Sequence, residues 1–406
     1  MRMSTTTLNQ QAVNAILDQQ TALATTQQQI ATGKRILNPA DDPVASVELL
    51  GLNAAQSQTQ EYLANGQTAN TRLTLQEQAL TDSTTTLQSV RDLVVQANAG
   101  SNNVSDLKNI ATNIQSLAQQ LQGIANRQDA QGDYLFSGYS AATQPFVRSS
   151  SGAMAYVGDS GARSVPIGSG TSVQLGDPGS AIYMGVPTGN GMFTTAASAS
   201  NAGTGVIDAG SVTAPASWVA GQYTITFTSP STWQVSDASG NPVTDASGNP
   251  VTGTYTGSSG TIAFNGIQVG ISGAPAANDT FTIAPSSTQS VFTTLDNLTT
   301  ALNNAGSSAS ARAQLSTQLT GALQQIDQSM GQVSKVTTNV GARLSLISST
   351  ATSLNSQSTV LTGQISKLAD LDYASATAKL SQQYVGLQAA ELSYSQIAQL
   401  SLFKYL

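Results

Sequence analysis

Apolar side chains recur every seven residues in the first part of the chain. Ile16, Leu23 and Ile30 keep this spacing near the start, and a second series runs from Leu73 to Val94. Such spacing places the apolar side chains on one face of a helix and is typical of helices that pack in bundles or coiled coils. The first part of the chain is therefore predicted to be helical.

The longest regular series lies toward the C-terminus. Apolar or small residues alternate at steps of four and three from Leu319 to Leu368, and no proline interrupts them. An ordinary globular helix would be expected to end within ~20 residues. The series instead predicts one long bundle helix, which at ~1.5 Å per residue would measure roughly 75 Å.

Between these helical arms the pattern changes to alternation of apolar and polar residues. The segments Gln222–Thr228, Thr261–Asn265 and Thr280–Ile283 alternate with period two, and turn-forming residues separate them. This alternation predicts strands. The octapeptide DASGNPVT occurs twice in succession, at 237–244 and 245–252, and predicts a duplicated hairpin tip at the surface. The expected fold is α+β and multidomain: a long α-helical coiled coil or bundle formed by both chain ends, with an inserted all-β domain in the middle.

The changes of pattern divide the chain into five regions. Boundaries are placed where helical spacing gives way to alternation or to turn residues. The regions are an N-terminal assembly segment at 1–42, the N-terminal part of a helical bundle domain at 43–140, the inserted β domain at 141–288 with an extra outer module at 195–285, the C-terminal part of the bundle domain at 289–368, and a C-terminal assembly helix at 369–406.

The composition removes most catalytic chemistry. Among 406 residues there is no cysteine and no histidine, and charged residues make up 9%, against ~25% in ordinary soluble proteins. The commonest general base, the thiolate nucleophile and the soft metal ligands are therefore missing. We assign no catalytic, cofactor-binding or metal-binding residue and predict a protein that is not an enzyme.

Charge and hydropathy exclude two further classes. No lysine or arginine lies between Arg163 and Arg312, so we expect no nucleic-acid binding, which needs clustered cations. No run approaches the ~18 apolar residues of a membrane-spanning helix, so we expect no membrane insertion. The start, MRMSTTTLNQQ, lacks the apolar stretch of a cleavable signal peptide. Export, if it occurs, is expected to use another route.

The stretch GKRILNPADDP at 33–43 gathers a basic pair and two adjacent aspartates in a chain that is poor in charge. Gly33 suits the left-handed residue that ends a helix. Asp42 followed by Pro43 is typical of the start of the next helix. A catalytic carboxylate pair would have to face one substrate atom, and no histidine exists to complete such a site. We therefore predict a helix joint that comprises Gly33, Lys34, Arg35, Asp41, Asp42 and Pro43.

An apolar stripe runs through the last part of the chain. A free chain end usually frays and is polar, so an end this apolar is expected to be buried, in its own chain or in a neighbouring copy. Its natural partner is the stripe of the N-terminal helix, and the surplus apolar surface indicates assembly; a closed bundle within one chain is the alternative. The predicted assembly interface comprises Ile16, Leu23, Ile30, Leu380, Tyr384, Leu387, Tyr394, Ile397, Leu400 and Phe403.

Three motifs carry a resemblance to a known family. They are T-G-K-R-I-L-N-P-A-D-D-P-V at 32–44, Y-L-F-S-G-Y at 134–139 with Pro145-Phe146, and L-S-L-F-K-Y-L at 400–406. With them the chain resembles the flagellin-like axial proteins of the bacterial flagellum, and within that group most closely the hook-associated protein 3 family. In the middle, residues 266–283 are similar to a β module of hook-associated protein 1.

The resemblance implies an extracellular structural component at the junction between the flagellar hook and filament. It implies a homo-oligomeric ring with hook-associated protein 1 on the hook side, flagellin on the filament side, and a cytosolic export chaperone at the C-terminal segment. It further implies type III export and chain ends that form coiled coils on assembly, because ordering costs ~1–2 kcal/mol per residue. Flagellin, hook-associated protein 1 and, in another class, an adhesin carried on the β domain are the alternatives.

Overall fold

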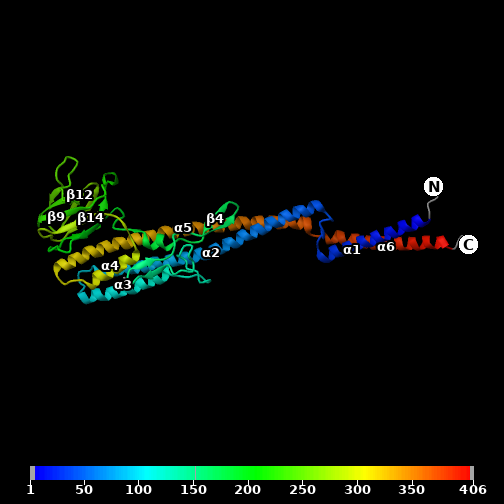
Figure 1. Cartoon of the computed structure of the whole chain (residues 1–406), viewed down its shortest axis with the longest axis horizontal. Helices are drawn as coiled ribbons and strands as arrows, with labels where there is room; N and C mark the ends of the chain where they lie inside the picture. Colours follow the sequence, from blue (N-terminus) through cyan, green and yellow to red (C-terminus); the bar gives the residue numbers. More distant parts are fainter. Residues whose placement is uncertain (1–4, 151, 403–406) are drawn as a thin grey trace. The chain divides into compact units, whose positions relative to one another are not determined.

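The computed structural model describes residues 5–150 and 152–402. Helices at both ends flank a middle region of antiparallel strands, which confirms the expected fold class (Figure 1). The long helices are α1 (Thr5–Thr32), α2 (Pro43–Ala97), α3 (Val104–Ala125), α4 (Val291–Asn303), α5 (Ala309–Ala369) and α6 (Tyr373–Leu402). The chain forms two compact units, one of residues 1–64 with 349–406 and one of residues 65–348.

The strands all lie in the second unit. Those preceding and leading into its outer part are β1 (Phe146–Arg148), β2 (Met154–Tyr156), β3 (Ser164–Gly168), β4 (Thr171–Gln174), β5 (Val186–Pro187), β6 (Phe193–Ala197), β7 (Val206–Ile207) and β8 (Ser211–Val212). The others are β9 (Tyr223–Ser229), β10 (Thr232–Asp237), β11 (Thr252–Thr254), β12 (Ser259–Phe264), β13 (Ile267–Ser272), β14 (Thr280–Pro285) and β15 (Thr288–Gln289).

In the first unit, α1 and α6 lie side by side (Figure 1). Gln19 Nε2 donates to the carbonyl oxygen of Gln383 at 3.0 Å across the pair. The beginning of α2 and the end of α5 form the rest of the unit, where Gln56 Nε2 donates to Ser358 Oγ at 2.8 Å. This unit contains the break between α1 and α2 and the break between α5 and α6.

The helical core of the second unit follows the predicted spacing. Leu73, Leu80 and Leu87 of α2 are completely buried, and so are Ile326 and Val340 of α5. Helix α5 has 61 residues, so the long C-terminal helix expected from the 4-3 spacing is present. Asn103 and Asp106 form a capping box that starts α3, which packs beside α4.

A separate apolar core holds the outer β module, residues 193–285. Five strands form one antiparallel sheet in the order β11-β10-β9-β14-β6, and β12, β13, β7 and β8 form another. Phe193, Phe227 and Phe281 of the first sheet share a buried cluster with Val269 and Ile271 of the second. This cluster is distinct from the helical one, so the module has a core of its own.

The module joins the helical part through a narrow neck of two short strands. β5 pairs with β15, and the pairing continues at Thr188, whose N–H donates to the carbonyl oxygen of Ser287 at 2.8 Å. Ser286 Oγ donates to the carbonyl oxygen of Thr188 at 2.7 Å. The two ends of the module are therefore adjacent in space.

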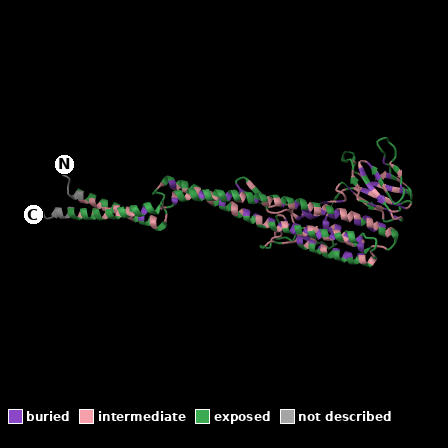
Figure 2. Ribbon diagram, turned by 180° about the vertical axis from the view of Figure 1, so that it is seen from behind, coloured by how far each residue is buried: buried purple, intermediate pink, exposed green. Residues whose placement is uncertain are grey.

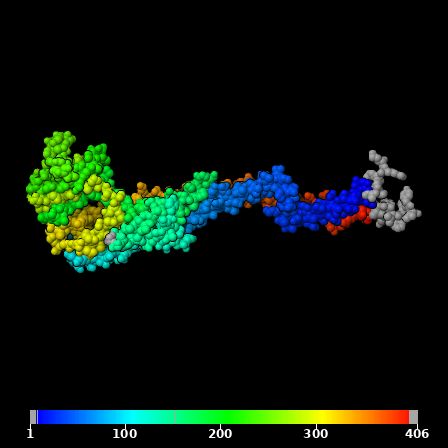
Figure 3. Space-filling view, viewed as in Figure 1, coloured from blue at the N-terminus to red at the C-terminus, as the bar shows by residue number. Residues whose placement is uncertain are grey.

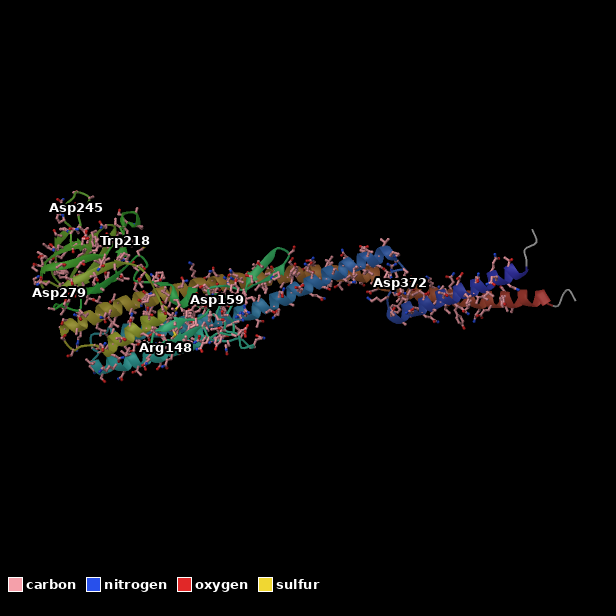
Figure 4. All side chains as sticks on the ribbon, viewed as in Figure 1. Arg148, Asp159, Trp218, Asp245, Asp279 and Asp372 are labelled. Atoms are coloured by element: carbon pink, nitrogen blue, oxygen red, sulfur yellow. The ribbon has the colours of Figure 1, made fainter. Side chains whose placement is uncertain are left out.

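The tandem octapeptide forms two short hairpins at the tip of the module, where Asp245 is labelled in Figure 4. Each hairpin closes on an aspartate, and Asp237 Oδ1 accepts from the N–H groups of Ser239 and Asn241, both at 2.9 Å. At the base, three valines form a closed ring of backbone hydrogen bonds. Val243 donates to Val235 at 2.9 Å, Val251 to Val243 at 2.7 Å, and Val235 to Val251 at 3.0 Å.

Candidate assembly site

The break between α1 and α2 is joined to the break between α5 and α6. Gly33 ends α1 with φ of +66°. The N–H of Arg35 donates to the carbonyl oxygen of Ala369 at 2.7 Å, and the N–H of Leu371 donates to that of Gly33 at 2.9 Å. The predicted joint at 33–43 is therefore half of a double joint, and its partner is the segment 368–373.

The side chain of Arg35 bonds to both halves of the double joint. Its Nε and Nη2 donate to the carbonyl oxygen of Leu368 at 3.1 and 3.0 Å, and its Nη1 lies 3.2 Å from Asp42 Oδ2. Leu368 lies in the last turn of α5, where carbonyl groups lack helical partners and carry partial negative charge. A guanidinium group with several fixed donors suits this position.

The aspartates of the double joint hold free backbone N–H groups. Asp42 Oδ1 accepts from the N–H of Ala45 at 3.0 Å, which is the geometry of an N-cap for α2. Asp41 Oδ2 accepts from the N–H groups of Leu37 and Asn38 at 3.0 and 2.9 Å. Asp372, labelled in Figure 4, accepts from the N–H of Ala374 at 3.0 Å and from Ser375 Oγ at 2.6 Å at the start of α6.

These contacts lower two carboxyl pKa values. For Asp42 the main cause is the N–H of Ala45, followed by the side chain of Arg35. For Asp372 the main cause is the hydroxyl of Ser375, followed by the backbone N–H groups of Ser375 and Ala374. The remaining predicted joint residues make simpler contributions: Lys34 forms an isolated β-bridge with Asp370, and Pro43 is the first residue of α2.

Most of the predicted interface residues line the α1–α6 pair without being fully covered by it. Ile16, Leu23 and Ile30 of α1, like Leu380, Leu387 and Tyr394 of α6, are half-buried. Tyr384 is 55% exposed. Ile397 and Leu400 belong to α6, but their side chains lie outside the described part of the chain, as does all of Phe403. Among the described side chains of α1 and α6, none larger than alanine or threonine is buried.

Two further groups of apolar residues are more exposed than the predicted ones. Val385 and Leu392, seven residues apart on α6, are 61% and 62% exposed. Val44, Val47 and Leu50 at the start of α2 are 80%, 73% and 72% exposed. Figure 2 shows exposed positions along most of both segments. The regular spacing of these residues along their helices could have indicated a second apolar face. Spacing alone, however, does not show which face of a helix is covered by a neighbouring helix.

The described residues hold no group of three or more acidic side chains that could bind a metal ion. No helix within the described ranges is long and apolar enough to cross a membrane. The features that distinguish the terminal unit are thus its double joint and its uncovered apolar side chains.

Comparison with known proteins agrees with this architecture. Residues 3–141 match the bacterial flagellin N-terminal helical region, and residues 323–406 match the bacterial flagellin C-terminal helical region. Residues 196–285 match the D2-like domain of flagellar hook-associated protein 1. The two ends of the chain therefore define a flagellin-like protein, and the outer β module is similar to a domain of a different hook-associated protein.

Individual relatives narrow the family. The crystal structure of flagellar hook-associated protein 3 from Legionella pneumophila is 31% identical, with a TM-score of 0.74 over 78% of this chain and 98% of that one. FlgL of Xanthomonas campestris is 33% identical, with a TM-score of 0.70 over 77% of this chain and 98% of that one. Flagellar hook-associated protein 3 of Escherichia coli is 33% identical over 183 residues, which are 45% of this chain and 57% of the relative.

The chain belongs to the flagellar hook-associated protein 3 family, and the resemblance carried by its three motifs is confirmed. The match to the curated Escherichia coli relative spans only about half of that protein, 57% of its length.

Proposed function

We propose that this protein is a structural component of the bacterial flagellum that forms the junction between hook and filament. Its family supports this function, and the uncovered apolar side chains of the terminal helix pair are the structural observation that carries the mechanism. Two helices side by side leave Val385 and Leu392 more than 60% exposed. Burying such side chains stabilises by ~1.5–3 kcal/mol each, so neighbouring copies that cover them drive assembly.

In this proposal the subunits form a homo-oligomeric ring through coiled coils of their terminal segments, 1–42 and 369–406. The bundle segments 43–140 and 289–368 form the next layer, and the β region 141–288 faces outward. Hook-associated protein 1 binds on the hook side and flagellin on the filament side. The predicted interface residues and the exposed Val44, Val47 and Leu50 would lie between subunits.

Before assembly, the apolar C-terminal segment would be held by a cytosolic export chaperone. The protein would then leave the cell through the flagellar type III route. Folding of the ends on assembly would account for the apolar surface that one chain leaves uncovered. The entropic cost of ordering the ends is offset only when neighbouring copies bury that surface.

The assembly mechanism is tested with Val385→Ser/Leu392→Ser, introduced into a strain that lacks the chromosomal gene. We expect hooks without filaments and flagellin released into the medium, since polar side chains remove the gain from burial between copies. Electron microscopy of the cells and detection of flagellin in the culture supernatant measure both effects.

The matched control is Val157→Ser/Val219→Ser, which changes two valines of the second unit that are 51% and 61% exposed. These substitutions should leave filaments normal. Filaments of ordinary number and length with Val385→Ser/Leu392→Ser would contradict the proposed mechanism. Motility in the deletion strain itself would contradict the junction function.

A further inference from the structure

A cleft of about 800 Å³ lies within the second unit, between the outer β module and helices α4 and α5. Figure 3 shows the hollow where the green and yellow segments meet. Its walls include β6 and the side chains of Asn297, Gln314, Gln318 and Gln325. No charged or aromatic side chain is among the lining residues. The cleft therefore favours an uncharged occupant that forms hydrogen bonds, and it offers no ring on which a flat ligand could stack.

One wall of the cleft is the outer edge of a sheet. β6 is the last strand of the five-stranded sheet and pairs only with β14. The N–H of Ser198 donates to the carbonyl oxygen of Thr280 at 3.1 Å. Because bonded residues alternate along an antiparallel pair, Ala196 also bonds toward β14, whereas the N–H and C=O groups of Thr195 and Ala197 point to the outer edge. Among the described residues, no strand pairs with this edge.

A second feature of the cleft is an unpaired hydroxyl group. Thr317 of α5 lines the cleft and is 4% exposed, and its Oγ1 has no hydrogen-bond partner in the part of the chain that the structure describes. Thr320, one turn further on, instead donates to the carbonyl oxygen of Ser316 at 2.9 Å. A buried hydroxyl without a partner is uncommon in folded proteins.

We propose that this cleft binds an extended peptide segment with small, uncharged side chains. The segment adds a strand to the outer edge of β6, where the backbone groups of Thr195 and Ala197 continue the ladder. Amide and hydroxyl side chains of α4 and α5 face its other edge. A charged side chain in the segment would lose water and find no partner of opposite charge in the cleft. This binding activity is separate from the assembly of the terminal helices.

The probe is a fluorescein-labelled hexapeptide, acetyl-Thr-Ala-Thr-Ala-Thr-Ala-amide, titrated with the full-length protein and followed by fluorescence polarisation. We expect saturable binding, and at least ~10-fold weaker binding when the fourth residue of the peptide is lysine or aspartate. Equal binding of the charged peptides, or no binding at millimolar protein, would overturn the proposal. Displacement of the peptide by maltotriose would overturn it in favour of a sugar site.

The role of the strand edge is tested by Ala197→Pro. Proline removes an N–H group that makes no ladder bond, so the sheet keeps its hydrogen bonds while the edge loses a donor. The control is Thr254→Pro on β11, at the opposite edge of the same sheet. The neighbouring Tyr255 donates to Ser231, so the N–H of Thr254 points outward by the same alternation. We expect at least ~10-fold weaker binding with the first variant only; equal affinities would contradict the edge-binding geometry.

A second pair of variants avoids any change in the sheet. Gly321 lines the cleft, and a Cβ atom there would meet nothing within 4 Å, which is also true of Gly331 further along α5. Gly321→Phe fills the cleft and should abolish peptide binding, whereas Gly331→Phe lies outside it and should leave binding unchanged. Helical circular dichroism checks that both variants fold. Retained affinity in Gly321→Phe would show that the peptide binds elsewhere.

Discussion

At the scale of single residues, the double joint works because short acidic side chains hold backbone N–H groups that no helix can satisfy. Asp42 and Asp372 each start a helix at one of the two breaks. Both are charged in the folded protein and both bind protons less readily there than in an unfolded chain, since hydrogen bonds to the ionised form lower their pKa values. The stability of the joint should therefore depend on pH.

The sign follows from proton linkage. A carboxyl group with a lowered folded-state pKa stabilises the fold above its unfolded pKa of ~3.9, and the contribution is lost as pH falls through the lower folded-state value. We expect Asp42→Asn/Asp372→Asn to lower the melting temperature at pH 6 and to have a smaller effect at pH 2, because the contribution of the ionised groups declines as pH falls through their lowered pKa values. Circular dichroism melts at the two pH values measure the difference.

Asp18→Asn/Asp92→Asn serves as the control for removing two negative charges, because both residues are exposed on helix surfaces away from the breaks. It should not reproduce this pattern. A melting difference for the joint variant that is the same at pH 6 and pH 2 would show that the lost charge is not the cause.

At the scale of elements, the break between α1 and α2 depends on a left-handed residue. Gly33 has φ of +66°, and a Cβ atom there would lie 2.9 Å from Tyr373 Oη. Tyr373 is 53% exposed and its ring can move aside, so the backbone conformation is the larger obstacle. An L-residue in this conformation costs ~1–2 kcal/mol.

Gly33→Ala should therefore destabilise the first unit by about 1 kcal/mol. Gly51→Ala provides the matched control, because Gly51 lies inside α2 with nothing within 4 Å of its missing Cβ. Alanine there should stabilise by up to ~1 kcal/mol. Amide hydrogen exchange across residues 20–60 separates the two cases, as faster exchange is expected only for Gly33→Ala. Equal effects of the two variants would mean that the break does not require glycine.

The elements also show what the sequence could predict. The 4-3 spacing after Leu319 predicted the long helix because each turn buries the same face, and α5 includes that whole range. Helix α5 starts at Ala309, ten residues before the first residue of the 4-3 spacing. This start is set by Ser308, whose hydroxyl oxygen accepts from the N–H of Ala311, and the apolar pattern gives no sign of it. The joint at 33–43 was predictable from local capping, but its partner at 368–373 was not, because that contact links residues that are far apart in the chain.

At the scale of the whole molecule, the chain forms two separate hydrophobic cores, one mainly between helices and one between β-sheets. The helical cluster and the β cluster share no buried residue. In the five-stranded sheet, β14 lies between β9 and β6, which are far from it in the sequence. Alternation of apolar and polar residues predicts single strands, but it does not predict which distant strands pair. The proposed peptide cleft was equally hidden, because its threonine, glutamine and alanine side chains come from six separate segments between residues 188 and 325, without periodic spacing.

Separate cores predict that the β module can be removed. Replacing residues 189–286 with Asn-Gly joins Thr188 to Ser287, which already form a backbone hydrogen bond of 2.8 Å, through a two-residue turn. We expect the shortened protein to keep its helical circular dichroism and a single cooperative melt. As a control, the same Asn-Gly turn can replace residues 169–170 between β3 and β4. The buried side chains of this hairpin belong to the helical core, and the control leaves the β module in place. Loss of cooperative melting only in the shortened protein would show that the helical core depends on the module.

The ring of Val235, Val243 and Val251 gives the tip of the module a property of its own. Each octapeptide leaves the ring at one valine and returns at the next, so a chain with a single copy would close as a simple hairpin on two valines. Adding or removing one complete octapeptide would therefore change the number of hairpins at the tip, while the residues beneath it keep their register.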